Sequence, residues 1–226
     1  MNKPNFIGIG GMRCGTTWLD AMLRLHPDIN MPKKKEIHYF DWNYRKGDKW
    51  YLEQFPEGFT GEITPGYSIL NKNRIKQVKK LLPDVKIILI LRNPIERAYS
   101  HALFDFRKKN ITPSDKDFID HFNSKKSILK GSYCSMIKKW EDYFPMLIPY
   151  YDYIQTNPNI VFKNVCQFIG TTPINLPDEI LKTRYSSTKN KGVPDKFKKP
   201  LINIYEKEII NLYHLRNNKL ILNWLK

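Results

Sequence analysis

The chain has 226 residues, of which 41% are hydrophobic and 13% aromatic, so its composition excludes an intrinsically disordered protein. This length suits one folded domain spanning residues 1–226. The 38 Lys and Arg residues outnumber the 22 Asp and Glu residues, which gives a formal net charge of +16. Such a surface would attract a nucleic acid, an anionic membrane, an acidic polysaccharide or a polyanionic cofactor. A general bias toward Lys, Asn and Ile would explain the same excess.

The three cysteines, Cys14, Cys134 and Cys166, follow neither C-x-x-C spacing nor the Cys/His spacing of a metal site. We interpret them as reduced thiols, which are typical of a cytoplasmic protein. The first residues, MNKPNFIGIGG, enter a short apolar strand directly and show no signal-peptide or membrane-spanning pattern. The sequence therefore predicts a cytoplasmic protein with no transmembrane segment and no metal site.

The first predicted elements are a buried strand at residues 5–9 and a helix from about 17 to 25, which Pro27 ends. The turn between them reads GGMRCGTTW (residues 10–18) and is similar to the phosphate loop G-x-x-x-x-G-K-[ST], except that Thr16 replaces the lysine. A strand, a glycine-rich turn and a helix together direct backbone N–H groups toward an anion. The donors that this loop offers are the Arg13 side chain, the hydroxyls of Thr16 and Thr17, and the amides around Gly15.

A second strand–helix unit follows at residues 85–91, VKIILIL, an aliphatic run that is typical of a central parallel strand. The strand leads to Arg92, and the next residues, N-P-I-E, form a cap for a helix that runs to about residue 108. Two strands that each lead into a helix predict an α/β fold with its ligand site at the carboxyl ends of the strands.

Beyond residue 110 the sequence becomes more helical and less regular, with no internal repeat and no long linker. Helical spacing predicts further helices at 118–129, 132–143, 158–169 and 197–215, and the polar, turn-rich residues 183–194 predict a loop.

The end of the second strand argues against magnesium chemistry. A phosphoryl-transfer enzyme would place there an acidic residue that holds the metal, whereas this chain has Arg92. Two strand ends that both present arginine describe a site for an anionic nucleotide in which cationic side chains neutralise the leaving group. The alternatives are a nucleotide or small-molecule kinase with a degenerate P-loop, and a non-catalytic nucleic-acid binder, for which the sequence offers charge but no recognition motif.

Two motifs together, RCGTTWL at 13–19 and LRNPxxRxxS at 91–100, resemble the PAPS-dependent sulfotransferases. PAPS is 3′-phosphoadenosine 5′-phosphosulfate, and its product after transfer is PAP. The segments HP at 26–27, KEIHYF at 35–40, GEITPGY at 61–67 and GSY at 131–133 are similar to the heparan sulfate and related carbohydrate branch. The resemblance implies a P-loop NTPase-like α/β fold, with one central parallel β-sheet flanked by helices and PAPS as the cofactor.

The resemblance also implies which residues bind PAPS. The first loop would hold the 5′-phosphosulfate through Arg13, Cys14, Gly15, Thr16, Thr17 and Trp18. Arg92 and Ser100 would bind the 3′-phosphate, unless Ser100 is an ordinary polar helix position. Lys191 and Gly192 would close over the cofactor, with Lys189 as an alternative to Lys191. Many relatives have lysine at the position of Arg13, whose guanidinium would here stabilise the leaving phosphate.

An acceptor hydroxyl or amine must lose a proton as it attacks sulfur. By the resemblance, Glu36 matches the catalytic base of the heparan sulfate branch, and His38 is the alternative base and an acceptor contact. Glu62 is a further candidate acceptor contact. Each has a structural explanation too: a surface carboxylate for Glu36, a structural histidine for His38, and a loop carboxylate beside a lysine for Glu62. The sequence predicts metal-independent, in-line sulfuryl transfer to a hydroxyl or amine, with a carbohydrate favoured as acceptor and no nucleic acid as partner.

Overall fold

The computed structural model describes residues 2–185 and 192–225. These residues form two compact units, the first made of residues 2–91 and 138–185 and the second of residues 92–137 and 192–225. The two motifs predicted to bind the cofactor lie in different units: the phosphate loop belongs to the first unit, and Arg92 is the first residue of the second. The expectation of one domain over residues 1–226 stays a prediction.

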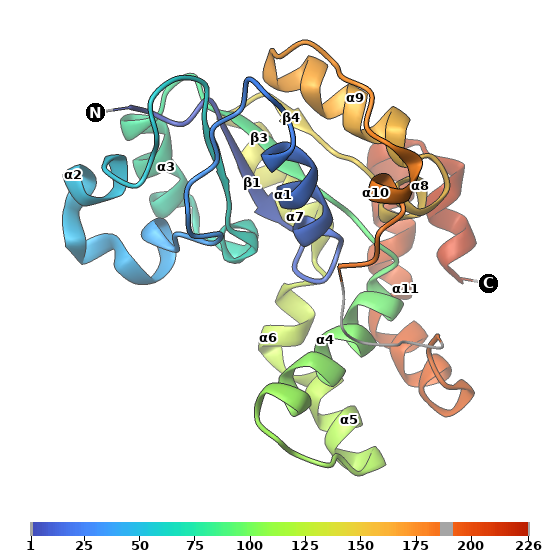
Figure 1. Cartoon of the computed structure of the whole chain (residues 1–226). Coiled ribbons are helices and arrows are strands. Elements are labelled where there is room, and N and C mark those ends of the chain that lie inside the picture. The colour runs from blue at the N-terminus through green and yellow to red at the C-terminus, as the bar shows by residue number, and fades with distance from the viewer. Residues whose placement is uncertain (1, 186–191, 226) are drawn as a thin grey trace. The chain divides into compact units, whose positions relative to one another are not determined.

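The first unit is built on a four-stranded parallel sheet (Figure 1) with the strand order β2-β1-β3-β4. Its strands are β1 (Phe6–Gly10), β2 (Gly61–Ile63), β3 (Lys86–Leu89) and β4 (Met146–Leu147). Apart from Glu62 and Lys86, the residues of β1, β2 and β3 are apolar or glycine and buried, because helices cover both faces of a parallel sheet. This arrangement confirms the predicted α/β class and the central position of the strand at 85–91.

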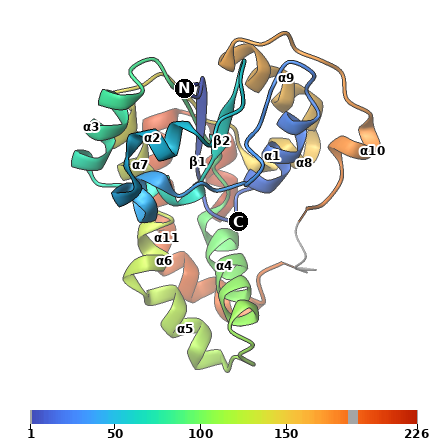
Figure 2. The same cartoon turned by 60° about the vertical axis from the view of Figure 1, so that its left-hand side comes forward.

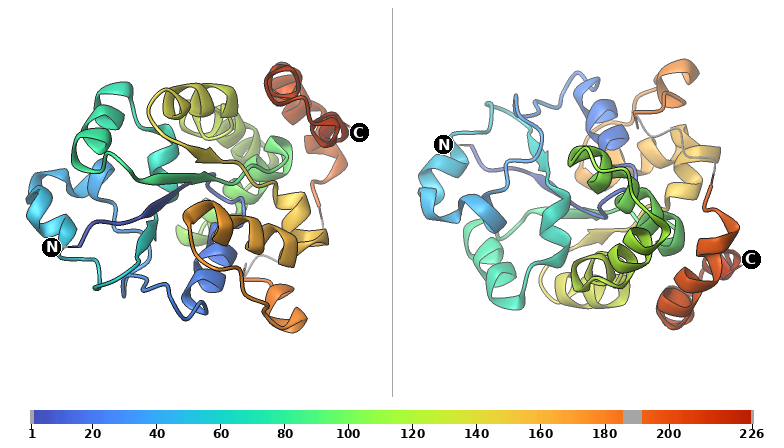
Figure 3. Two further views of the ribbon diagram at one scale, coloured as in Figure 1. Left: turned by 90° about the horizontal axis from the view of Figure 1, so that it is seen from above. Right: turned by 90° about the horizontal axis from the view of Figure 1, so that it is seen from below.

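Helices lie on both faces of this sheet, as Figure 3 shows from above for α1, α9 and α3. Trp18 and Met22 of α1 pack with Phe162 and Val165 of α9 in one buried apolar cluster that also contains strand residues such as Ile88. The helices of the unit are α1 (Thr16–Arg24), α2 (Gly47–Leu52), α3 (Lys72–Leu81), α8 (Tyr151–Thr156), α9 (Pro158–Ile169) and α10 (Asp178–Leu181). Three short helical segments complete it: η1 (Tyr39–Asn43), η2 (Tyr44–Lys46) and η3 (Pro65–Ile69).

The second unit is helical, and Figure 2 shows its helices α4, α5, α6 and α11. Its elements are α4 (Pro94–Lys108), α5 (Asp115–Asn123), α6 (Lys125–Leu129), α11 (Asp195–Arg216) and η4 (Lys219–Leu225). Helix α7 (Tyr133–Glu141) begins in this unit and ends in the first. As predicted, the Asn93 side chain caps α4, because it accepts a hydrogen bond from the Ile95 N–H at 3.0 Å.

The structure corrects some sequence expectations. The helix predicted at 118–129 is two helices, because Ser124 ends α5 and its side chain accepts the Ser127 N–H as the N-cap of α6. The strands β2 and β4 were not predicted, since each is two or three residues long and has no periodicity to detect. Among the described residues, no helix is long and apolar enough to cross a membrane.

Candidate functional site

The phosphate-loop sequence joins β1 to α1 at the carboxyl end of the sheet's central strands. The Gly11 N–H donates to the Ile90 carbonyl at 2.7 Å, which ties the loop to the chain that follows β3. Gly15 is the N-cap of α1 with φ 94°, a left-handed conformation that favours glycine. The first intrahelical bond runs from the Leu19 N–H to the Gly15 carbonyl, so the N–H groups of the first turn have no acceptor within the helix. This end of α1 therefore has the geometry of an anion site.

The side chains predicted to bind the phosphosulfate divide into two sets. Arg13 is half-buried and Thr17 is exposed at the loop, whereas Thr16 is 6% exposed. Cys14 and Trp18 lie within the apolar cluster between α1 and α9, and the Trp18 Nε1–H donates to the Leu181 carbonyl at 2.8 Å. Their contribution to an anion site would therefore come from the backbone.

The predicted base, Glu36, lies in a charged cluster with its neighbours in the sequence. The His38 Nε2 is 3.2 Å from the Glu36 Oε2, and the His38 Nδ1 is 2.9 Å from the Asp41 Oδ2. Lys35 donates to the other Glu36 oxygen at 2.7 Å. A histidine between two carboxylates can hold or pass on a proton at either ring nitrogen. The structure thus brings together the two alternative bases, Glu36 and His38.

The short helix η3 links this cluster to the end of β1. The Thr64 N–H, directly before η3, donates to the Gly8 carbonyl of β1 at 2.9 Å, and the Tyr67 hydroxyl accepts the Tyr39 N–H at 2.7 Å. A Cβ placed on Gly66 would lie 2.5 Å from the Asp41 Oδ2, so only glycine allows this close approach. The block GEITPGY therefore supports the segment that carries Glu36 and His38.

Three of the predicted site residues have a left-handed backbone conformation. Among the described residues, φ is positive at five non-glycine positions, and three of these are Arg13 (67°), Glu36 (64°) and His38 (55°). A left-handed φ costs energy for residues other than glycine and is common at functional sites. These three residues are also the three predicted to be catalytic.

Glu62 lies on strand β2 rather than in a loop and is 1% exposed, and within the described part of the chain its hydrogen-bond partners are hydroxyls and not a lysine. The Tyr51 hydroxyl donates to one of its oxygens and the Thr64 hydroxyl to the other, both at 2.6 Å. Burial raises the pKa of Glu62 to about 7, against the hydrogen bonds, which lower it. Its enclosed position favours support of the neighbouring chain over direct contact with an acceptor.

The residues predicted to bind the 3′-phosphate belong to the second unit. The Arg92 Nη2 donates to the Glu96 Oε2 at 2.9 Å. The Glu96 side chain therefore pairs with Arg92 instead of bonding back to the N-cap residue Asn93. Ser100 is 3% exposed on α4. In the late loop, Gly192 has φ 95°, and Lys189 and Lys191 lie outside the described residues.

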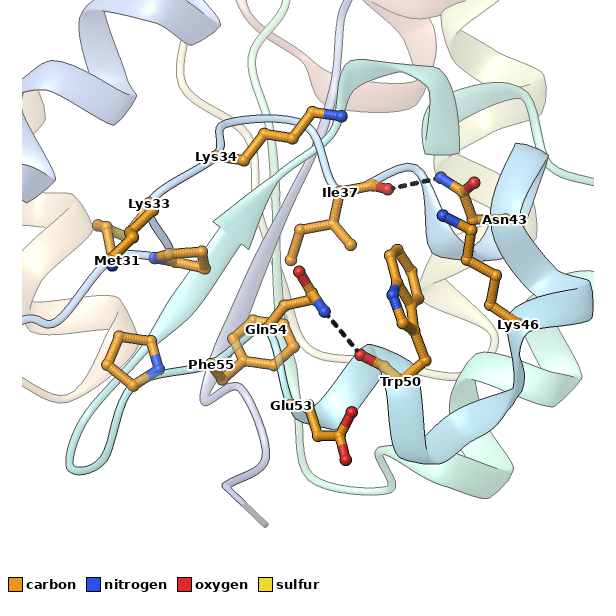
Figure 4. Close-up of a pocket in the computed structure, with 12 residues that line it drawn as sticks. Met31, Lys33, Lys34, Ile37, Asn43, Lys46, Trp50, Glu53, Gln54 and Phe55 are labelled. Atoms are coloured by element: carbon orange, nitrogen blue, oxygen red, sulfur yellow. Dashed lines mark hydrogen bonds between the residues drawn. The ribbon is translucent and has the colours of Figure 1, made fainter.

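A pocket of about 490 Å³ opens beside the Glu36 segment, within the first unit (Figure 4). The Asn43 amide donates to the Ile37 carbonyl at 3.0 Å, which fixes the chain between Glu36 and His38 at the pocket wall. The Lys46 Nζ lies 4.2 Å from the centre of the Trp50 ring. The lining combines apolar side chains with cations, among them Ile37, Trp50, Phe55, Lys33, Lys34 and Lys46.

Sequence reasoning gave no role to three residues that contact the alternative bases Glu36 and His38: Lys35, Asp41 and Trp42. Lys35 belongs to the KEIHYF segment, whereas nothing in the spacing of Asp41 and Trp42 distinguishes them from ordinary surface residues. Trp42 stacks on His38 with the ring centres 3.7 Å apart and the planes 10° apart. Only the turn of the chain at the left-handed residues 36 and 38 brings these side chains together.

Comparison with known proteins extends the sequence likeness. A family model described as a sulfotransferase domain matches residues 3–201. The chain is 41% identical over 128 residues to the membrane-associated sulfotransferase kil1 of Dictyostelium discoideum, covering 52% of this chain and 27% of that protein. It is 30% identical over 208 residues to bifunctional heparan sulfate N-deacetylase/N-sulfotransferase 1 of Caenorhabditis elegans, covering 82% of this chain and 24% of that protein. The matches thus span about a quarter of the length of these two relatives.

Solved structures share the fold. A sulfotransferase from Alicyclobacillus acidocaldarius superposes with a TM-score of 0.80 at 22% identity, with 100% of both chains covered. The mouse sulfotransferase SULT7A1, solved in complex with PAP, gives a TM-score of 0.61 at 17% identity and covers 97% of this chain and 85% of that one. At these identities the likeness concerns the fold alone.

Proposed function

The chain belongs to the sulfotransferase domain family, and on that premise we propose that it transfers a sulfuryl group from PAPS to a hydroxyl or amine of a carbohydrate. The observation that carries the proposal is a phosphate loop without a lysine at the end of β1, together with a Glu36–His38–Asp41 cluster that η3 links to the same strand. The heparan sulfate relatives support the carbohydrate acceptor. The family match also disfavours the kinase alternative.

The loop at the start of α1 binds the 5′-phosphosulfate in this proposal. Arg13, the hydroxyls of Thr16 and Thr17 and the first-turn amides donate to its oxygens. The Arg13 guanidinium neutralises the negative charge that develops on the bridging oxygen as the sulfur–oxygen bond to the 5′-phosphate breaks. No metal ion takes part.

Arg92 and Ser100 bind the 3′-phosphate in the proposal, with Gly192 and Lys191 in the loop that closes over the nucleotide. The Arg92 partner Glu96 has a side chain that is 46% exposed, so its carboxylate can return to water when a phosphate takes the guanidinium. PAP in the mouse neighbour supports this choice of nucleotide.

Glu36 removes the proton from the acceptor as the acceptor oxygen or nitrogen attacks sulfur on the side opposite the leaving phosphate. One bond to sulfur forms while the bond to the phosphate oxygen breaks, and the proton passes to the Glu36 carboxylate. His38, hydrogen-bonded to Glu36 and Asp41, orients that carboxylate and can share the proton. The pocket beside this segment receives the acceptor, because its lysines and Trp50 suit a sugar that carries anionic groups.

The test is transfer of labelled sulfate from PAPS to a panel of glycans, phenols and amines, in the presence of a chelator. We expect transfer to a glycan that the chelator does not reduce. Glu36→Gln should lower kcat by at least about 100-fold, the usual contribution of a general base, and leave PAP binding unchanged. Glu57→Gln, at an exposed carboxylate of the same unit, is the matched control. Full activity of Glu36→Gln would exclude Glu36 as the base.

The 3′-phosphate assignment has its own measurement. We expect the Arg92→Ala, Ser100→Ala double variant to bind PAP no more tightly than AMP, which lacks the 3′-phosphate, in titration calorimetry. An unchanged preference for PAP would refute the assignment, and a wild-type protein that binds neither PAP nor PAPS would refute the proposed function.

A further inference from the structure

The most exposed large apolar side chain among the described residues lies beside the predicted base. Trp42 is 75% exposed, whereas the next most exposed, Ile160, reaches 60%. Single exposed apolar residues are common on proteins. Trp42 differs from such a residue because its position is set by specific contacts.

Contacts of both the backbone and the ring hold Trp42 in place. Its backbone N–H donates to the His38 carbonyl at 3.1 Å and to the Asp41 Oδ1 at 2.8 Å, and its ring lies nearly parallel to the His38 imidazole with the ring centres 3.7 Å apart. One face of the indole therefore covers the imidazole. The exposed fraction of the side chain leaves the other face open to solvent.

The open face is close to the proposed chemistry. The imidazole beneath Trp42 contacts Glu36 through Nε2 at 3.2 Å. A ring stacked on the outer face of Trp42 would lie on the order of 7 Å from that imidazole, two aromatic stacking distances away. An acceptor on Trp42 can then present a hydroxyl or amine of the same sugar, or of the next one, to Glu36.

We propose that Trp42 is a platform on which a pyranose ring of the acceptor glycan stacks during transfer. The negative π face of an indole attracts the C–H groups on the flat face of a sugar, while the sugar hydroxyls stay in water. This inference rests on the proposed sulfotransfer and adds a specificity-determining residue to it.

An open platform suits a sugar better than a phenol. Small aromatic ligands bind in enclosed, mostly apolar pockets that bury most of their surface, and a side chain that is 75% exposed encloses nothing. The next residue, Asn43, lines the pocket beside the Glu36 segment, and three cations of that lining, Lys33, Lys34 and Lys46, can pair with carboxylate or sulfate groups on neighbouring sugars. A glycan chain can use the platform and the pocket together.

The experiment compares Trp42→Ala and Trp42→Phe with the wild type, each saturated with PAP. Binding of a heparosan hexasaccharide and of chitotetraose is measured by titration calorimetry, and kcat and KM are measured for the same glycans and for 4-nitrophenol. We expect Trp42→Ala to weaken binding of whichever glycan is the better acceptor by roughly tenfold and to raise its KM similarly. Trp42→Phe, which keeps a π face, should restore most of the affinity.

Two controls separate a platform from a merely structural role. PAP affinity should be the same in all variants, and Ile160→Ala, at the next most exposed apolar residue, should bind glycan like the wild type. If Trp42 only positions His38, Trp42→Ala lowers kcat equally for every acceptor and leaves glycan affinity unchanged, which overturns the inference.

The remaining outcomes are equally decisive. A wild type that binds PAP but transfers sulfate only to 4-nitrophenol, or that binds neither glycan, overturns the platform and leaves sulfotransfer standing. A wild type that binds no PAP refutes the proposed function itself, and the platform with it.

Discussion

In the first unit, a buried carboxylate, Glu62, accepts a hydroxyl hydrogen bond on each of its oxygens. In the second unit, the fully buried guanidinium of Arg97 donates from Nη2 to the Ser127 carbonyl and the Tyr205 hydroxyl, while its Nε and Nη1 have no partner among the described residues. In the acidic cluster, formed by Glu62, Tyr51 and Thr64, each carboxylate oxygen has a hydroxyl donor. In the basic cluster around Arg97, two guanidinium nitrogens are buried without a partner among the described residues.

The basic cluster of the second unit extends beyond Arg97. Lys130 donates to the His101 Nε2 at 2.8 Å, and the buried His101 Nδ1 has no partner among the described residues. Burial, with the nearby charge of Lys130, lowers the pKa of His101 to about 2. The Asp105 Oδ2 lies 3.5 Å from the His101 Nε2 and supplies a counter-charge there, whereas the Arg97 guanidinium is hydrogen-bonded to neutral groups. Burying a charge among neutral partners costs free energy, so Arg97 should lower stability. The acidic cluster, in contrast, supports the strand and η3 that hold the Glu36 segment.

The largest expected effect is on the pH dependence of stability. The folded protein holds the Glu62 proton more tightly than the unfolded chain does, because burial raises the pKa from 4.5 to about 7. The contribution of Glu62 to the free energy of unfolding therefore falls by on the order of 3 kcal/mol as the pH rises between these two values. Urea unfolding of wild type and Glu62→Gln at pH 4.5 and 7.5 should show this difference, and parallel pH profiles would contradict it.

The next effect concerns the hydroxyl donors to Glu62. Tyr51→Phe removes one hydrogen bond to a buried carboxyl group, which should lower the free energy of unfolding by about 2 kcal/mol at pH 7.5. Tyr153→Phe, at a Tyr hydroxyl on a side chain that is 41% exposed, is the matched control and should change it by less than about 0.5 kcal/mol. Equal stability of the two variants would show that the acidic cluster contributes nothing.

A substitution in the basic cluster should change the free energy of unfolding in the opposite direction from Tyr51→Phe. Arg97→Met removes a buried charge whose hydrogen-bond partners, over the residues that the structure describes, are neutral, so we expect the free energy of unfolding to stay the same or to rise by about 1 kcal/mol. Arg107→Met, at an exposed arginine of the same helix, controls for helix propensity. A loss of several kcal/mol in Arg97→Met alone would mean that the guanidinium stabilises the unit.

The smallest expected effect is a shift in the pKa of His101. Lys130→Met should raise the pKa of His101, because the Lys130 charge is the largest cause of its low value after burial. Lys126→Met, which removes a cation with a weaker influence on His101, should raise it less. Ring-proton chemical shifts followed by NMR against pH measure both, and an unchanged midpoint in Lys130→Met would refute the coupling.

Much of the fold follows from local rules of sequence. The predicted strand at 5–9 and helix at 158–169 match β1 and α9, because an apolar run and an i, i+4 pattern, each followed by glycine, specify them without distant contacts. The break at Ser124 was missed because a serine within a helical pattern can face solvent as easily as it can cap.

The sequence indicated candidate residues for the site, but it did not indicate their geometry. The KEIHYF segment indicated Glu36 and His38, whereas the partners Lys35, Asp41 and Trp42 appear only in the folded chain. Glu62 was predicted as an acceptor contact, with a loop carboxylate beside a lysine as the alternative, and it lies buried on β2 between two hydroxyls. Desolvation, which raises its pKa, comes from residues that the sequence does not place next to it.

By itself, the sequence determined the α/β class, the sulfotransferase family and the phosphate loop, because these depend on short patterns of residue type. Only the tertiary structure decided three features of the candidate site: the left-handed backbone at Glu36 and His38, the burial of Glu62 and the stacking of Trp42 on His38. Each of these depends on chain segments such as η3 that approach from elsewhere in the sequence, and a strained backbone persists only where such packing holds it.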